Sequence, residues 1–146
     1  MITTADEALL RRAVAIAARA TTLGDAPYGS LLAGPDGTII AEAHNTVRRD
    51  QDITAHPELK LARWAARELD QATAARTTLY TSCQPCGMCA GGIVRSGLGR
   101  VVYALSTEQL VELNPESGAW PTVPQDGPAL FDEARTPIDD YYRPQP

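Results

Sequence analysis

Apolar residues recur at helical spacing in the N-terminal part of the chain, on a face formed by Leu9, Leu10, Val14, Ile16 and Ala17. Thr4 and Glu7 have the spacing of a capping box, so we predict an amphipathic helix over residues 4–21. Helical spacing returns in the segment ELKLARWAARELD, which begins at Glu58, and again over residues 86–96.

Short apolar runs bounded by turn residues predict strands at residues 28–33, 38–43, 77–81 and 100–105. The first two are joined by the turn sequence GPDG and form a hairpin. A further helix begins at Ser106 or Thr107, and beyond Asn114 the chain is rich in proline and predicted to be irregular. This order of elements implies a mixed sheet covered by helices, a three-layer α/β/α sandwich.

Composition narrows the class of protein. The 146 residues are 44% hydrophobic and 21% charged, which suits one globular domain over residues 1–146. We expect residues 114–146 to form a proline-rich C-terminal tail of that domain. Neither a signal peptide nor an apolar run of membrane-spanning length is seen, so we expect a cytoplasmic protein without a membrane partner. The net charge of -5 opposes binding to phosphate backbones.

All three cysteines lie in the stretch TSCQPCGMC, at Cys83, Cys86 and Cys89. Such clustering without a secretion signal indicates metal or redox chemistry rather than disulfides. Pro85 precedes a predicted helix whose spacing puts the sulfurs of Cys86 and Cys89 on one face. The motif His56-Pro57-Glu58 repeats this arrangement, because proline is favoured at the first position of a helix.

Two helix starts of this kind would direct the positive ends of their dipoles at one point, which favours thiolates. Cys86 and Cys89 together with His56 form a suitable ligand set for Zn²⁺. Three protein ligands leave a fourth position for water, as in catalytic zinc sites. Glu58, two residues after the histidine, is placed to take a proton from that water.

A fourth protein ligand would turn the site into a closed, non-catalytic zinc module. Cys83 would give a Cys₃His site and His44 a Cys₂His₂ site. Cys83 lies before Pro85 and off the helix face, His44 follows the predicted hairpin, and a chain of this size needs no metal to fold. These points oppose the closed site, but the spacing alone leaves it open.

The paired motifs resemble those of the zinc-dependent nucleobase and nucleoside deaminases, the cytidine-deaminase-like superfamily, whose signature is His-x-Glu followed by Pro-Cys-x-x-Cys. The resemblance extends over about residues 5–110 and is strongest to the branch of guanine deaminases and tRNA adenosine deaminases. The additional matching segments are Pro27-Tyr28-Gly29, His44-Asn45 and Thr81-Ser82-Cys83.

The resemblance implies a central mixed sheet of five strands, zinc as cofactor and a homodimer. It also implies that His56, Cys86 and Cys89 hold the zinc, and that Cys83 is a buried neighbour rather than a ligand.

The resemblance further implies that Glu58 acts as base and then as acid, that Asn45 hydrogen-bonds the substrate ring, and that Tyr28 lines the site or stacks on the base. The sequence departs from the family at Pro57, where alanine is usual, and at Gln84, where glutamate is usual. The second change removes a charge beside the site.

We expect a small-molecule substrate, namely a free nucleobase or a guanine-like, cytosine-like or triazine-like heterocycle, because the chain is acidic. A tRNA-specific adenosine deaminase is the alternative, and it would need a basic surface. In guanine deaminases of the family the C-terminal segment closes the pocket, often that of the partner subunit. Here the tail offers aromatic and acidic candidates, namely Trp120, Phe131, Tyr141, Tyr142, Glu116, Asp139 and Asp140.

Overall fold

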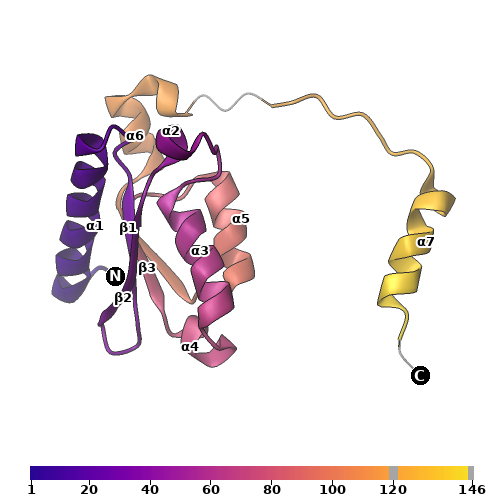
Figure 1. Ribbon diagram of the computed structural model, residues 1–146, viewed down its shortest axis with the longest axis horizontal. Helices are drawn as coiled ribbons and strands as arrows, with labels where there is room; N and C mark the ends of the chain where they lie inside the picture. Colours follow the sequence, from indigo (N-terminus) through magenta and orange to yellow (C-terminus); the bar gives the residue numbers. More distant parts are fainter. Residues whose placement is uncertain (119–121, 145–146) are drawn as a thin grey trace.

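A mixed sheet forms the centre of the molecule (Figure 1), a computed structural model that describes residues 1–118 and 122–144. Its strand order is β2-β1-β3-β4. β1 pairs antiparallel with β2 and β3, whereas β3 and β4 are parallel, so the predicted mixed sheet is confirmed. The strands are β1 (Gly29–Ala33), β2 (Ile39–His44), β3 (Thr78–Cys83) and β4 (Arg100–Leu105).

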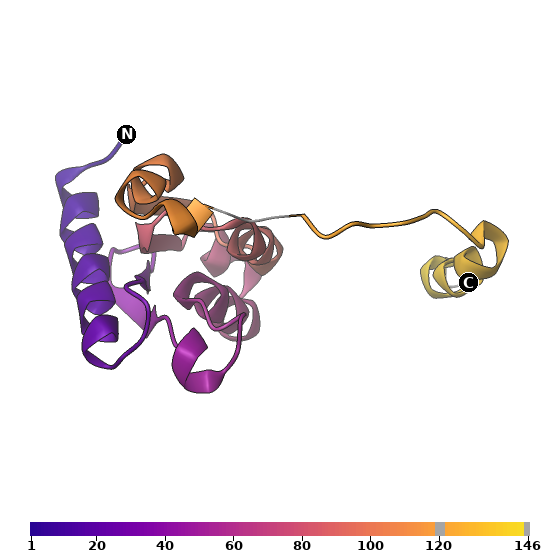
Figure 2. The same ribbon diagram turned by 90° about the horizontal axis from the view of Figure 1, so that it is seen from above.

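Helices cover both faces of the sheet, as the predicted three-layer α/β/α architecture requires (Figure 2). One face packs against α1 (Thr4–Thr22), and the other carries α3 (Pro57–Glu68) and α5 (Gly87–Ser96). Neighbouring strand residues point to opposite faces. Leu31 therefore joins the core under α1, whereas Leu32 joins the core under α3 and α5.

Gly29 allows α1 to approach β1 at backbone distance. A Cβ at this position would overlap the backbone of Ala13 and Ala17 in α1. Overpacking of this kind costs about 1–3 kcal/mol. The glycine of the Pro27-Tyr28-Gly29 motif thus has a structural role, because it holds the first layer against the sheet.

The capping box of α1 lies one residue earlier than predicted. Thr3 is the N-cap, and Asp6 rather than Glu7 returns the bond to its backbone. Asp6 is 4% exposed and also accepts hydrogen bonds from Tyr80 and Arg100. The prediction was wrong because both spacings satisfy the local rule, and distant residues decide between them.

The expected fifth strand is absent from the described residues, in which the sheet has four strands. After β4 the chain enters α6 (Thr107–Leu113) and the 3-10 helix η1 (Pro115–Gly118). The capping box of Ser106 and Gln109 starts α6 directly after the strand. Residues 122–130 then run away from the sheet instead of along β4 (Figure 1).

The proline-rich tail is not irregular throughout. Residues Phe131–Tyr142 form α7, which lies apart from the rest of the molecule (Figures 1 and 2). The prediction missed this helix because Pro137, which lies inside it, is normally a helix breaker. Trp120, an aromatic candidate of the tail, falls outside the described residues.

Two short helices connect the main elements: α2 (Val47–Asp50) lies between β2 and α3, and α4 (Gln71–Ala75) lies between α3 and β3. In the described part of the chain, no helix combines the length and apolarity that a bilayer span requires.

Candidate active site

Two helix starts face each other at one end of the sheet. Pro57 is the first residue of α3, and His56 is its N-cap. Cys86 is the N-cap of α5, which begins at Gly87, one residue later than predicted. Neither N-cap side chain makes a capping hydrogen bond, so the imidazole and the thiol remain available for another partner.

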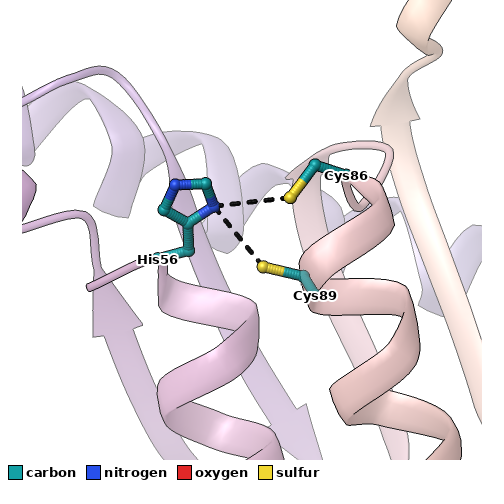
Figure 3. Close-up of side chains that lie close together, drawn as sticks. All are labelled: His56, Cys86 and Cys89. Carbon is teal, nitrogen blue, oxygen red and sulfur yellow. Dashed lines mark hydrogen bonds between the residues drawn. The ribbon is translucent and has the colours of Figure 1, made fainter. Parts of the chain in front are cut away.

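The side chains of His56, Cys86 and Cys89 converge between these helix starts (Figure 3). Nδ1 of His56 lies 3.6 Å from Sγ of Cys86 and 3.4 Å from Sγ of Cys89. A tetrahedral zinc ion with ordinary Zn–S and Zn–N bonds requires N···S separations of about 3.6 Å. The donor types and their spacing therefore fit zinc.

The two thiols influence each other strongly. Hydrogen bonds from Cys89 and His56 lower the pKa of Cys86 to about 3. The pKa of Cys89 is raised, chiefly by its bond to the neighbouring sulfur and also by burial. One thiolate forms readily, and a second beside it needs a cation to offset the repulsion.

Glu58 lies in the first turn of α3 and is 7% exposed. Burial raises the pKa of its carboxyl group above the ordinary value. The Ser30 hydroxyl lies 3.3 Å from Oε1 of Glu58 and 2.8 Å from the Thr81 hydroxyl. A carboxylate whose pKa is raised in this way holds a proton more readily than an ordinary glutamate does, which suits it to proton transfer.

A cavity of about 810 Å³ opens over these residues. Its walls include two of the three candidate metal ligands, His56 and Cys86, the carboxylate of Glu58, and both substrate contacts expected from the sequence, Asn45 and Tyr28. The structure thus brings the predicted site residues into one place.

Asn45 directly follows β2 and is held by two hydrogen bonds. Its backbone N–H donates to Tyr28 O at 3.0 Å, and its side-chain oxygen accepts from Val47 N at 3.0 Å. The amide NH₂ is therefore the part of this side chain left to donate into the cavity. Tyr28 is half-buried and lines the cavity, so it is not only a core aromatic.

The far wall of the cavity was not predicted as such. It comes from α6 and η1, through residues that include Leu110, Asn114 and Glu116. Leu110 and Asn114 are four apart, a helical spacing that could have suggested a shared face. Arg48 of α2 also lines the cavity.

The two candidates for a fourth ligand lie outside the metal-binding group. Within the described residues, that group comprises His56, Cys86 and Cys89 and includes neither Cys83 nor His44. Cys83 is buried at the end of β3. Nδ1 of His44 lies 2.9 Å from the backbone oxygen of Asn45.

Comparison with known proteins agrees with this geometry. Residues 3–105 match the family described as "Cytidine and deoxycytidylate deaminase zinc-binding region". The chain belongs to this deaminase family. It is therefore a zinc-binding enzyme of a class that hydrolyses carbon–nitrogen bonds, and the closed, non-catalytic alternative that the spacing left open is not supported.

Relatives of this deaminase carry different names. A protein of Schizosaccharomyces pombe named "Probable cytosine deaminase" is 34% identical over 92% of this chain and 81% of that protein. The crystal structure of guanine deaminase from Bacillus subtilis has a TM-score of 0.76, with 31% identity and 92% of each chain covered. The tRNA-specific adenosine deaminase of Haemophilus influenzae is 36% identical over 69% of this chain and 58% of that protein.

Gln84 links the cysteine loop of this deaminase to the far wall of the cavity. Its Oε1 accepts from Thr107 N at 3.0 Å, at the start of α6, and its backbone N–H donates to Leu105 O at 2.7 Å. An amide makes the first of these bonds as well as a carboxylate does. The replacement of the family's usual glutamate therefore keeps this connection while removing a charge from the cavity.

Proposed function

We propose that this deaminase hydrolyses the exocyclic amine of a free nucleobase or a related heterocycle that is guanine-like, cytosine-like or triazine-like, with release of ammonia. The observation that carries the proposal is the position of Glu58. It is a buried carboxyl group with a raised pKa, and it lies in the same cavity as a ligand set that fits zinc.

In this reaction His56, Cys86 and Cys89 would hold the zinc, which would supply a Lewis acid that makes water more acidic. Glu58 takes the proton from the attacking water and delivers it to a ring nitrogen. The carboxylate then takes the proton of the hydroxyl that has been added to the ring carbon and passes it to the amine, so that the C–N bond breaks, ammonia leaves and a carbonyl remains. One carboxylate serves as base and then as acid, which commonly contributes about 10²–10⁴-fold to the rate.

The substrate contacts favour a ring with both acceptors and N–H donors. Asn45 lines the cavity and its side-chain oxygen already accepts from Val47 N, so its amide NH₂ is the group left to donate to an acceptor on the ring. Glu116 of η1 also lines the cavity and can accept from a ring N–H or an amino group. Tyr28 lines the cavity where it can stack on the base.

The charges around the cavity favour a free base over a nucleic acid. Among the described residues that line the cavity, Arg48 is the only arginine or lysine. Three lining residues carry carboxyl groups, namely Asp25, Glu58 and Glu116. The net charge of the chain is -5. A groove for a polynucleotide normally carries an excess of positive charge.

A tRNA adenosine deaminase is the second candidate, because tRNA-specific relatives are as similar in sequence as those named for free bases. Arg48 at the cavity would then contact a phosphate. This candidate predicts an affinity for tRNA that falls steeply with salt concentration.

The deciding experiment measures ammonia release from guanine, cytosine, adenine, melamine, the matching nucleosides and a tRNA transcript. Rapid turnover of a base or triazine, with none of tRNA, supports the proposal. Turnover confined to tRNA would replace it with the second candidate. The Glu58→Gln variant, checked for zinc content and folding, serves as the inactive control.

We further propose that the chain forms one domain whose tail closes the cavity of a partner subunit in a homodimer. Phe131 and Ile138 of α7 are 72% and 57% exposed, and their spacing of seven places them on one helix face together with Tyr142. The tail leaves the body at η1, which lines the cavity. A second copy of this chain would cover that face.

The test of this arrangement is Phe131→Asp combined with Ile138→Asp. We expect the double variant to shift from dimer to monomer in light scattering and to lose turnover while retaining zinc. A wild-type chain that is monomeric and fully active would contradict the arrangement. We expect the enzyme in the cytoplasm, where a reducing environment keeps thiolate ligands available.

A further inference from the structure

Lys60 is the one lysine of the chain. It links α3, the helix that carries Glu58, to the segment after β2 that carries Asn45. It lies in α3, and its backbone N–H donates to His56 O at 3.0 Å. Its side chain crosses to the end of β2, where Nζ donates to His44 O at 2.9 Å and to the hydroxyl of Thr46. These two acceptors flank Asn45 in the sequence.

The segment around Asn45 is held from several directions. Thr46 donates its hydroxyl to Asp50 Oδ2 at 2.6 Å and its backbone N–H to Ala55 O at 3.0 Å. These bonds order the segment between β2 and α3. Lys60 adds a direct side-chain bond from the helix that carries the catalytic groups.

We propose that Lys60 is a positioning residue: its ammonium group fixes the amide of Asn45 relative to the helix that carries Glu58. An ammonium has three donors and no acceptor, so it can bind two oxygen atoms on either side of one residue. Partial burial lowers the pKa of Lys60, and nearby Asp50 and Asp25 oppose that effect. The role rests on the proposed function, because it requires Asn45 to contact the substrate.

The first test needs no substrate. In ¹⁵N-labelled zinc-loaded protein, the side-chain amide of Asn45 is assigned by the loss of its signal in Asn45→Ala. We expect Lys60→Met to shift or broaden this signal. The matched control is Arg63→Met, which removes an exposed cation from the same helix and should leave the signal unchanged. An Asn45 signal that is identical in Lys60→Met and wild type would overturn the inference.

The second test is kinetic and uses guanine, or cytosine if the ammonia panel selects it. A displacement of about 1 Å in a substrate-positioning group can cost about 100-fold in rate. We expect Lys60→Met to lower kcat/KM by about 10- to 100-fold at unchanged zinc content. In an Asn45→Ala background the same substitution should cost less than about 2-fold, because the group that it positions is gone.

Additive losses in this double-mutant cycle would mean that Lys60 acts elsewhere, and would leave the proposed function standing. If Asn45→Ala alone had no kinetic effect, the proposed substrate contact and the role of Lys60 would both fail. Should Lys60→Met not fold, Thr46→Val removes the hydroxyl that accepts from the ammonium, and the same signal and the same cycle decide the question.

Discussion

Two buried carboxyl groups of this deaminase lie in opposite surroundings. Asp6, on the α1 side of the sheet, is 4% exposed, and the guanidinium of Arg100 holds its pKa well below the usual range. Thr3 and Tyr80 donate to the same carboxylate. Glu58, on the other side, is 7% exposed and has its pKa raised by burial.

The difference matches a structural role for Asp6 and the proposed role of Glu58 in proton transfer. A carboxylate bonded to a cation and further donors stays ionised, so Asp6 can tie α1 to β3 and β4 but cannot readily take up a proton. Glu58 has a single described side-chain donor, Ser30, and keeps its proton affinity. A poorly compensated buried charge is costly for folding, and active sites are where such costs are found.

The largest expected effect comes from Glu58→Gln. Turnover should fall by about 10²–10⁴-fold, because the amide cannot accept and return a proton. Zinc content and the free energy of unfolding should show no comparable loss, since no ligand is removed. Ammonia release, metal analysis and urea unfolding measure these quantities. Full turnover in this variant would show that another group transfers the proton.

Asp6→Asn should act on stability instead. Removing the charge leaves Arg100 without its partner, and we expect a loss of about 2–3 kcal/mol in the free energy of unfolding. The value is below that of a fully buried pair because the Arg100 side chain is 43% exposed. The matched control is Glu7→Gln on the next, exposed position of α1, which should cost less than about 0.5 kcal/mol. Equal losses in the two variants would contradict the structural role of Asp6.

The same carboxylate predicts a pH dependence. Because the pKa of Asp6 is lower in the folded than in the unfolded chain, its contribution is fully present above the unfolded pKa of about 3.9. The contribution is lost as the pH falls from there towards the folded pKa. Urea unfolding of zinc-loaded protein at pH 5 and below should therefore show a flatter acid limb for Asp6→Asn than for wild type. If the unfolding free energies of the two proteins fell equally steeply with decreasing pH, the lowered pKa of Asp6 would be contradicted.

The smallest effect is expected at Cys83, the one cysteine outside the group of His56, Cys86 and Cys89. Cys83→Ser should retain one zinc per chain, because Cys83 lies outside the metal-binding group. Cys86→Ser should lose most of the zinc, since it removes a thiolate ligand. Metal analysis after gel filtration compares the two. Loss of zinc in Cys83→Ser would indicate that Cys83 is a fourth zinc ligand and that the site is of the closed, non-catalytic type.

Local sequence rules predicted much of the fold. The strand at residues 100–105 was placed at its observed bounds, and the starts of α3 and α5 were predicted from their prolines, that of α5 one residue too early. The rules failed where two local solutions were equivalent, as at the start of α1, and where a proline lies inside a helix, as in α7. The fifth strand came from family resemblance and is not found among the described residues.

Local rules predicted the helix α6, but its position at the cavity beside η1 and the bonds of Lys60 depend on tertiary packing. Nothing in the local pattern distinguishes Lys60 from an ordinary exposed helix residue. Its partners, His44 and Thr46, lie 16 and 14 residues away in the chain. A lysine side chain is long enough to reach several hydrogen-bond acceptors, and the packing of the fold selects the ones that it binds.

The sequence by itself determined which ligands share a helix turn, because helical periodicity places Cys86 and Cys89 together whatever surrounds them. It also determined the chemical type of the site, since a thiolate and imidazole set favours zinc. Only the tertiary structure decided that His56 meets these sulfurs across 30 residues of chain, and that Arg100 meets Asp6 across 94. The burial of Glu58 has the same origin, because it depends on how the sheet and helices exclude water around one side chain.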